Sequence, residues 1–400
     1  MKLNKILIII SFVTTDGFCQ SDAKLINGLN SIIKPITTIN PEDNFNDIEF
    51  LKNAANDATV FGIGESTHGT SLYNTYRQRL VRFLVQEMKY RAIIDEGDIL
   101  AAEKVDAYIN RKTDSLELIG GLRPVVTNKK ELDWLRRYNS DKSEKERVHI
   151  YGSEVRGFYG IVQKIKNLFF PNKVNETLKK FEGDIGVGYK NITKKDFEDI
   201  QKLSQKLVAE CKIPLYNYYL SLLNQQIDFA YRQRFGKNDF NIRDKYMFEN
   251  IKSIVLETPE NKAIILAHNG HLQKTKFTTL SSLGYLLNNF YGHKYFVTAT
   301  DFNFGSVYIY DFKAGNYKDI FFEKVEDKKA VEYYFTQCKY HNFFFPINDA
   351  LKNTETASFV NKTTKMLRNM STTGDIIKSP ISLAENYDLI VFFNDTGAKK

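Results

Sequence analysis

The chain has 400 residues, of which 42% are hydrophobic and 14% aromatic, so it can bury a sizeable core and a disordered chain is excluded. Its formal net charge is +8, from 56 basic and 48 acidic residues. Because the lysines are interspersed with acidic residues and form no basic block, this charge indicates a solvated surface, and we expect no nucleic-acid partner.

The N-terminus has the three parts of a secretory signal peptide. Residues 1–5 carry two lysines, residues 6–13 are apolar, and residues 17–19 offer small side chains for cleavage. The apolar run is too short to span a bilayer, and no later run is long enough. We therefore expect a signal peptide at 1–19 and a single exported domain at 20–400. It would be periplasmic or secreted, with no stable membrane insertion after cleavage.

Two cysteines, Cys211 and Cys338, remain in the mature chain under this interpretation. In an oxidising compartment they could form one disulfide, and two free buried thiols are the alternative. Neither is near a histidine in the sequence, so we assign them no chemistry.

Apolar runs alternate with amphipathic stretches between residues 58 and 153, which is typical of parallel strands joined by crossover helices. The runs predict strands at 59–64, 90–97 and 148–155, and the stretches predict helices at 71–89, 99–111 and 129–140. Further strands are predicted at 261–268, 293–302, 305–312 and 387–395. The expected fold is α/β, with a mostly parallel central sheet flanked by helices.

Residues from about 162 to 256 lack this alternation and are predicted to be almost entirely helical. Breaks are expected at Pro171, at the glycine-containing segment 183–188 and at Pro214. We interpret this segment as a helical cap inserted between two strands of the sheet, over the cleft.

Polar residues follow four of the predicted strands, where open α/β sheets form their sites. They are Glu65 and His68, Glu96, Glu154, and the pair His268 and His271. Each could separately be a helix cap or a turn residue. However, three carboxylates and three of the six histidines at four strand ends favour one shared site.

A histidine beside carboxylates is suited to act as a general base that activates water. The segment GESTHG differs from the serine-hydrolase elbow because His68 occupies a position that requires glycine. No phosphate loop or dinucleotide fingerprint is present, so we expect no cofactor. The same residues, His268 and His271 with Glu65 or Glu96, could instead bind zinc, although no spacing is a strong metal signature and we assign no metal ligand.

Two predicted helices add further polar residues. Arg77 lies two turns into the helix after the first strand, and its side chain can reach back toward the site. Phe240, Arg243, Met247, Asn250 and Ile254 share one face of a later helix. A buried arginine and amide on that face require polar partners. They either anchor the insertion to the core through a salt bridge or border the pocket.

Five segments, in this order, resemble the erythromycin esterase family. They are GIGESTHGT at 62–70 with Arg77, EMKYRAIIDEGD at 87–98, HIYGSE at 149–154, IRDKYMFENI at 242–251 and AHNGHL at 267–272. The likeness extends from about residue 61 to the final strand. It implies an α/β fold with a helical cap over an open cleft, and hydrolysis of the macrolactone ester of macrolide antibiotics, which gives resistance.

The resemblance also implies roles for individual residues. His68 would activate water, Glu65 and Glu96 would orient it or a neighbouring histidine, and Arg77 would bind substrate or the developing negative charge. His268 would complete the catalytic set, and the substrate-binding residues would be His271, Arg243, Met247, Asn250 and Glu154. The partner is then a small-molecule ester, namely a macrolide.

Two other functions are compatible with the sequence. One is an exported esterase or acyl-transfer enzyme that acts on a saccharide or another ester. The other is a non-catalytic protein of the same fold that binds a metal or a bulky ligand.

Overall fold

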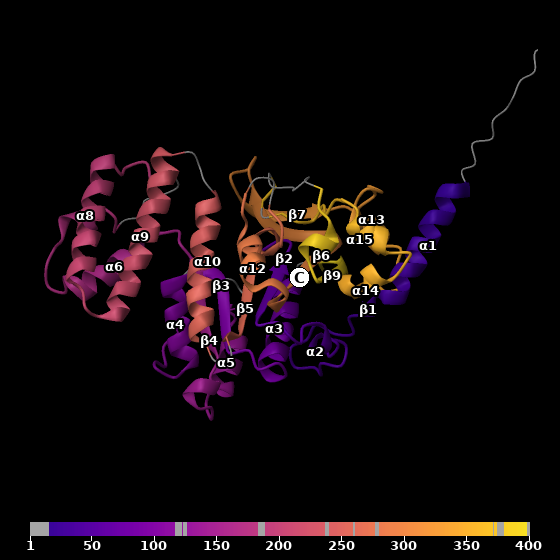
Figure 1. Ribbon diagram of the computed structural model, residues 1–400, viewed down its shortest axis with the longest axis horizontal. Coiled ribbons are helices and arrows are strands. Elements are labelled where there is room, and N and C mark those ends of the chain that lie inside the picture. The colour runs from indigo at the N-terminus through magenta and orange to yellow at the C-terminus, as the bar shows by residue number, and fades with distance from the viewer. Residues whose placement is uncertain are drawn as a thin grey trace, which may run out of the picture.

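The computed structural model describes residues 16–116, 122, 126–182, 189–236, 240–258, 261–276, 280–370, 372–373 and 380–397. Residues 1–15, with the charged and apolar parts of the predicted signal peptide, lie outside the described residues, as do 183–188 within the predicted insertion. Within the described ranges, nine strands form one sheet in the order β1-β8-β9-β6-β2-β5-β3-β4, with β7 paired to β6 (Figure 1). The strands are β1 (Lys34–Pro35), β2 (Val60–Glu65), β3 (Ala92–Asp98), β4 (His149–Glu154), β5 (Ala263–His268), β6 (Tyr295–Asp311), β7 (Asn316–Phe322), β8 (Asn342–Pro346) and β9 (Leu389–Asp395).

The prediction of a mostly parallel α/β sheet is confirmed. Strand β5 lies between β2 and β3, β4 pairs with β3, and β6 pairs with β2 and β9, all in parallel. The antiparallel pairs β1–β8, β8–β9 and β6–β7 gather at the opposite side of the sheet. The carboxyl ends of β2, β5, β3 and β4 are therefore neighbours, in that order.

One strand differs from the prediction. We expected separate strands at 293–302 and 305–312, but β6 continues unbroken from Tyr295 to Asp311. Gly305 has a φ of 126°, a conformation that glycine adopts readily, so the strand passes through this position without a turn. Consequently the first part of β6 pairs with β2 and β9, and its second part pairs with β7.

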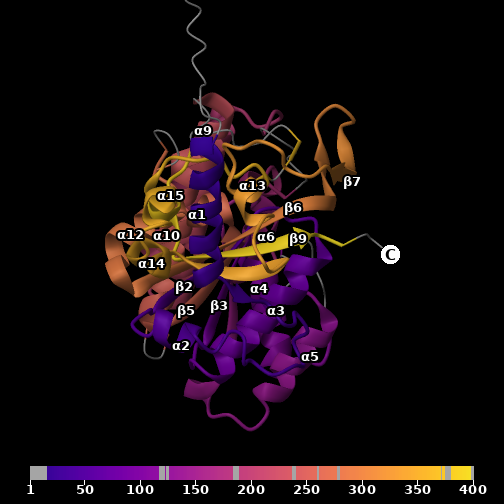
Figure 2. The same ribbon diagram turned by 90° about the vertical axis from the view of Figure 1, so that its right-hand side faces the viewer.

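Helices cover both faces of the sheet, which explains why its central strands are apolar throughout. Helices α3 (Ser71–Gln86), α4 (Ile99–Ile109) and α5 (Lys129–Tyr138) pack on one face, with Phe61 and Ile264 of the strands. Helices α10 (Phe240–Glu257) and α12 (Leu283–Tyr291) pack on the other, with Val60 and Ile265. Figure 2 shows these two groups on opposite sides of the strands.

The remaining helices complete these layers. Between β4 and β5, helices α6 (Phe158–Phe169), α7 (Glu176–Lys179), α8 (Lys194–Glu210) and α9 (Pro214–Phe235) enclose a small core of their own. They form a lobe beyond the β4 edge of the sheet (Figure 1), whereas α10 returns to pack on β3 and β4. The shorter or peripheral helices are α1 (Asp16–Ile32), α2 (Leu51–Ala54), α11 (Asn269–Leu272), α13 (Val331–Phe335), α14 (Ile347–Lys352), α15 (Ala357–Asn361) and α16 (Leu383–Asn386).

Cys211 and Cys338 are both free thiols, so they do not form the disulfide that was one of the two alternatives. Cys338 is partly buried, and burial raises the pKa of its thiol to about 12. No helix in the described ranges is both long and apolar enough to cross a bilayer.

Candidate active site

The loop after β2 brings Glu65 and His68 into direct contact. Glu65 Oε1 lies 2.6 Å from His68 Nδ1, and its other oxygen, Oε2, forms an ion pair of 2.6 Å with Arg77 Nη1. A carboxylate accepts hydrogen bonds, so Nδ1 carries a proton, and in the neutral ring Nε2 then keeps its lone pair. Glu65 is 2% exposed, whereas the side chain of His68 is 27% exposed. One buried carboxylate thus orients an imidazole that solvent can reach.

Glycine is required at Gly64, near the end of β2, and at Gly69 in the loop, because other chain segments approach the backbone closely at both positions. A Cβ on Gly64 would lie 2.3 Å from Asn269 Oδ1, and one on Gly69 would lie 1.9 Å from Tyr308 O. Tyr308 N in turn donates a hydrogen bond of 3.0 Å to Gly69 O. The loop ends at Thr70, whose side chain caps α3 by accepting from the backbone NH of Tyr73.

His268 ends β5 opposite Glu65, with which it pairs in register. Its Nε2 donates to Ser66 O at 3.0 Å, and its Nδ1 accepts from Gly270 N at 3.1 Å. Burial, reinforced by nearby His68, lowers the pKa of His268 to about 3. This neutral ring therefore has both nitrogens engaged with backbone, and it holds the Glu65–His68 loop against β5. Its ring meets that of His68 edge to face, 5.3 Å between centroids.

Arg243 of α10 connects the ends of β3 and β4. Its Nη2 donates to Glu96 Oε1 at 2.7 Å and to Glu154 Oε2 at 2.5 Å. Glu96 also accepts from the backbone NH of His268 through Oε2, at 3.0 Å. All three charged side chains are buried, and burial alone would oppose their ionisation. The charges of Arg243 and Arg156 outweigh burial and lower the pKa of Glu154 to about 2.

His271 lies beside this ion cluster. Its Nε2 accepts a hydrogen bond of 2.8 Å from Arg243 Nη1, and its Nδ1 donates to Asp244 at 2.9 Å. Burial favours the neutral ring, but Asp244 and Glu96 together outweigh it and raise the pKa of His271 above its ordinary value. The side chain is 22% exposed, so His271 and His68 are the two site imidazoles that solvent reaches.

The predicted convergence of the four strand ends is therefore present in the structure. Contacts run from Glu65 and His68 through His268 to Glu96, and on through Arg243 to Glu154. The carboxyl ends of adjacent parallel strands thus form one continuous polar cluster.

Five residues expected to contact substrate or its developing charge are buried, and Arg243 and Glu154 of the ion cluster are two of them. The other three are Arg77, Met247 and Asn250. Arg77 has no exposed area and lies behind Glu65, with Nη2 also donating to Ile63 O, so it positions the carboxylate. Met247 is fully buried in the core beneath α10. Asn250 is buried and bonds to Gln225 and to Ser153 O. The contacts of Met247 and Asn250 therefore anchor α10 to the sheet.

Sequence reasoning missed two contributors. Asp244, which follows Arg243, accepts from His271 and from the backbone NH of Leu283. An acidic residue beside a buried arginine was the available signal. Thr300 of β6 accepts from Ser66 N at 2.9 Å, and a strand hydroxyl of this kind carries no distinguishing pattern in the sequence.

Zinc binding was the alternative use of these side chains. In the portion of the chain that the structure describes, no group of three His, Cys, Asp or Glu side chains is arranged to hold a metal ion. His268 and His271 instead direct their ring nitrogens to protein partners.

We predict that Arg243→Met destabilises the fold by roughly 3–5 kcal/mol, because it leaves the buried carboxylates of Glu96 and Glu154 without their cation. Arg156→Met is the matched control: Arg156 pairs with the same Glu154, but its side chain is 56% exposed. The control should lose less than about 1 kcal/mol. Urea unfolding of both variants measures the difference, and equal losses would show that the buried bridge has no special weight.

A pH dependence follows from Glu154. Its folded-state pKa of about 2 lies below the ordinary 4.5, so it stabilises the fold above pH 4.5, and this contribution is lost as the pH falls toward 2. Glu154→Gln should therefore show a shallower loss of unfolding free energy than the parent between pH 4.5 and 2. Parallel slopes in urea titrations across that range would contradict the assignment.

Known proteins resemble this chain in sequence and in fold. A sequence model of the family described as Erythromycin esterase matches residues 217–396. Erythromycin esterase type II of Escherichia coli is 25% identical over 309 residues, covering 65% of this chain and 73% of that protein.

Solved structures agree with the fold. A succinoglycan biosynthesis protein superposes with a TM-score of 0.77 at 22% identity, covering 94% of this chain and 97% of its own. A histidine-to-asparagine mutant of the erythromycin esterase EreC, in its open conformation, superposes with a TM-score of 0.69 at 17% identity, covering 91% and 97%. Over residues 217–396 the chain is therefore similar in sequence to the erythromycin esterases, and it shares their fold.

Proposed function

We propose that this protein is an exported hydrolase that cleaves the macrolactone ester of erythromycin-type macrolides with water activated by His68. The observation that carries the proposal is the contact of 2.6 Å between Glu65 and His68 Nδ1. It leaves Nε2 as the basic atom of a partly exposed ring, and among the described residues no protein group bonds to that atom. The similarity of residues 217–396 to erythromycin esterases supports an ester of small-molecule size as the substrate.

In the proposed reaction, His68 Nε2 takes a proton from water as the water oxygen attacks the ester carbonyl. The carbonyl oxygen then becomes an oxyanion, and collapse of this tetrahedral intermediate breaks the bond to the alkoxy oxygen. The proton on His68 passes to that oxygen, so the products are a carboxylic acid and a hydroxyl on one opened ring. The histidine returns to its starting state.

Glu65 would hold the ring in the required tautomer and stabilise the imidazolium once His68 is protonated. Arg77 would keep Glu65 ionised and in place. His271 is the group we assign to stabilising the oxyanion. Its ring is partly exposed and its pKa is raised, so it can take up a proton on Nε2, which would then turn from Arg243 and donate to the oxyanion. His268 would act as the rigid support of the loop.

A second candidate is an exported esterase or acyl-transfer enzyme acting on a saccharide or another ester. The predicted N-terminal signal peptide supports it, because an envelope or extracellular location would expose the enzyme to such substrates. Mass spectrometry separates the two: macrolactone hydrolysis adds the mass of one water to erythromycin, whereas the second candidate would leave erythromycin intact and release acyl groups from acetylated sugars.

We predict that His68→Ala lowers kcat/KM for erythromycin hydrolysis by about a hundred- to ten-thousand-fold, the usual cost of losing a general base. The protein should remain folded, since His68 is partly exposed. His293→Ala, at an exposed histidine of the turn Gly292–Lys294, is the matched control and should retain parent activity. If His68→Ala hydrolyses erythromycin at the parent rate, the base is another group.

A further inference from the structure

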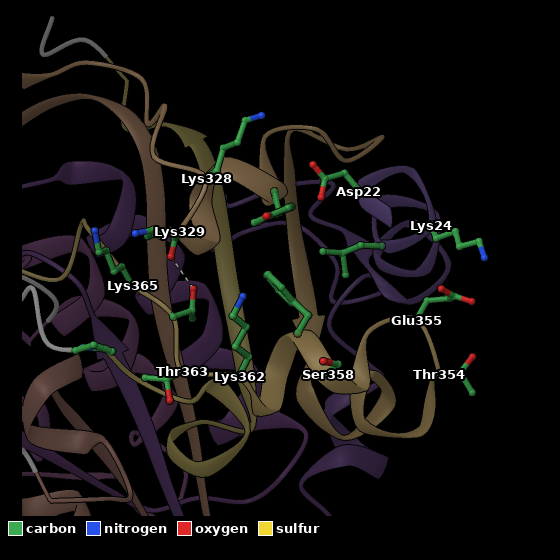
Figure 3. A pocket seen from close by; sticks show the side chains of 15 residues that line it. Asp22, Lys24, Lys328, Lys329, Thr354, Glu355, Ser358, Lys362, Thr363 and Lys365 are labelled. Atoms are coloured by element: carbon green, nitrogen blue, oxygen red, sulfur yellow. Dashed lines mark hydrogen bonds between the residues drawn. The ribbon is translucent and has the colours of Figure 1, made fainter. Parts of the chain in front are cut away.

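A second site lies in a cavity of about 760 Å³ that shares no residue with the active site (Figure 3). Residues of α1 and α15 and of the segments 328–329 and 362–365 line it. The rings of Tyr334 and Phe359 meet edge to face at its wall, and Phe335 packs next to them on Phe343 of β8. The cavity is thus at the β8 end of the sheet, whereas the active site is at the ends of β2 to β5.

The lining carries a surplus of positive charge. Five lysines line the cavity against two acidic residues, Asp22 and Glu355; the lysines are Lys24, Lys328, Lys329, Lys362 and Lys365. In Figure 3, Lys362 extends into the group of side chains, whereas Lys24 points away from the other lysines. Among the lining residues this is a surplus of three positive charges.

Most of these ammonium groups have no acidic partner. Lys365 forms an ion pair of 2.8 Å with Asp327. Lys328, Lys329 and Lys362 form no ion pair with any described residue, and Lys328 only approaches the ring of Tyr333, 5.9 Å from its centroid. Unpaired cations around one hollow attract an anion, because the concave wall concentrates their field.

The rest of the wall suits a ligand with a ring body. Leu25, Tyr334 and Phe359 give it an apolar surface, and Thr354, Ser358 and Thr363 add hydroxyl groups. A cavity of this size is in the range that holds small organic ligands and exceeds what a bare phosphate ion would fill. Lysine ammonium groups bind phosphate and carboxylate as point charges.

We propose that this cavity binds a small anionic sugar, carrying either a phosphate or a carboxylate group. Lys329 and Lys362 neutralise the anionic group, the hydroxyl side chains bond to sugar hydroxyls, and the ring rests on the apolar wall. This function goes beyond ester hydrolysis and does not depend on His68, so binding and catalysis can be measured separately.

Isothermal titration calorimetry on the mature protein tests the proposal with glucose 6-phosphate and glucuronic acid as the two anionic probes. Glucose and inorganic phosphate are the comparison ligands. We expect one or both anionic sugars to bind more tightly than either comparison ligand, and to bind more weakly as NaCl is raised. Tighter binding of glucose 6-phosphate would identify phosphate as the anionic group of the ligand, and tighter binding of glucuronic acid would identify a carboxylate.

Charge reversal then locates the site. Lys329→Glu/Lys362→Glu should weaken binding at least about tenfold, since two charged contacts are lost. Lys130→Glu/Lys145→Glu changes the net charge equally, at exposed lysines near α5, and should bind like the parent. Lys329→Gln/Lys362→Gln provides a milder variant should the reversal impair folding, and it should also weaken binding.

Three results would overturn the proposal. They are no binding of either anionic sugar, inorganic phosphate binding as tightly as glucose 6-phosphate, and equal losses in the cavity and control variants.

Discussion

The active site depends on how one buried carboxylate is shared. Glu65 is a buried residue at the end of β2, and each of its carboxylate oxygens contacts a different group. One oxygen pairs with buried Arg77, and the other contacts partly exposed His68. Burying a carboxylate without a cation is costly, and Arg77 removes that cost. The second oxygen can then fix the orientation and tautomer of the imidazole.

A second set of carboxylates, an arginine and an imidazole lies at the ends of β3 and β4. Glu96 bonds to the backbone of His268 and to Arg243, and Arg243 in turn bonds to Glu154 and His271. In both places an arginine from a helix lies behind carboxylates at strand ends, and an imidazole lies at the solvent side. The helices α3 and α10, which come from opposite faces of the sheet, thereby fix the site from both sides.

Much of this arrangement could be predicted from the sequence, because parallel strands end at a common edge and apolar runs mark where they end. That logic placed Glu65, Glu96, Glu154 and His268 together. It could not tell which side chains face solvent, since that depends on how α3 and α10 dock. Arg77 and Met247 were therefore assigned to substrate although packing buries both. The sequence predicted two strands that meet near Gly305, because a glycine inside a strand and a glycine that ends a strand have the same pattern.

The central claim is that Glu65 holds neutral His68 with its proton on Nδ1 and its lone pair on Nε2. Long-range ¹⁵N–¹H NMR of the histidine rings, at a pH where His68 is neutral, tests it directly, with His68→Ala used to assign the signals. The account predicts a protonated Nδ1 and an unprotonated Nε2 for His68, and the reverse pattern for His268. A His68 ring protonated on Nε2 would contradict it.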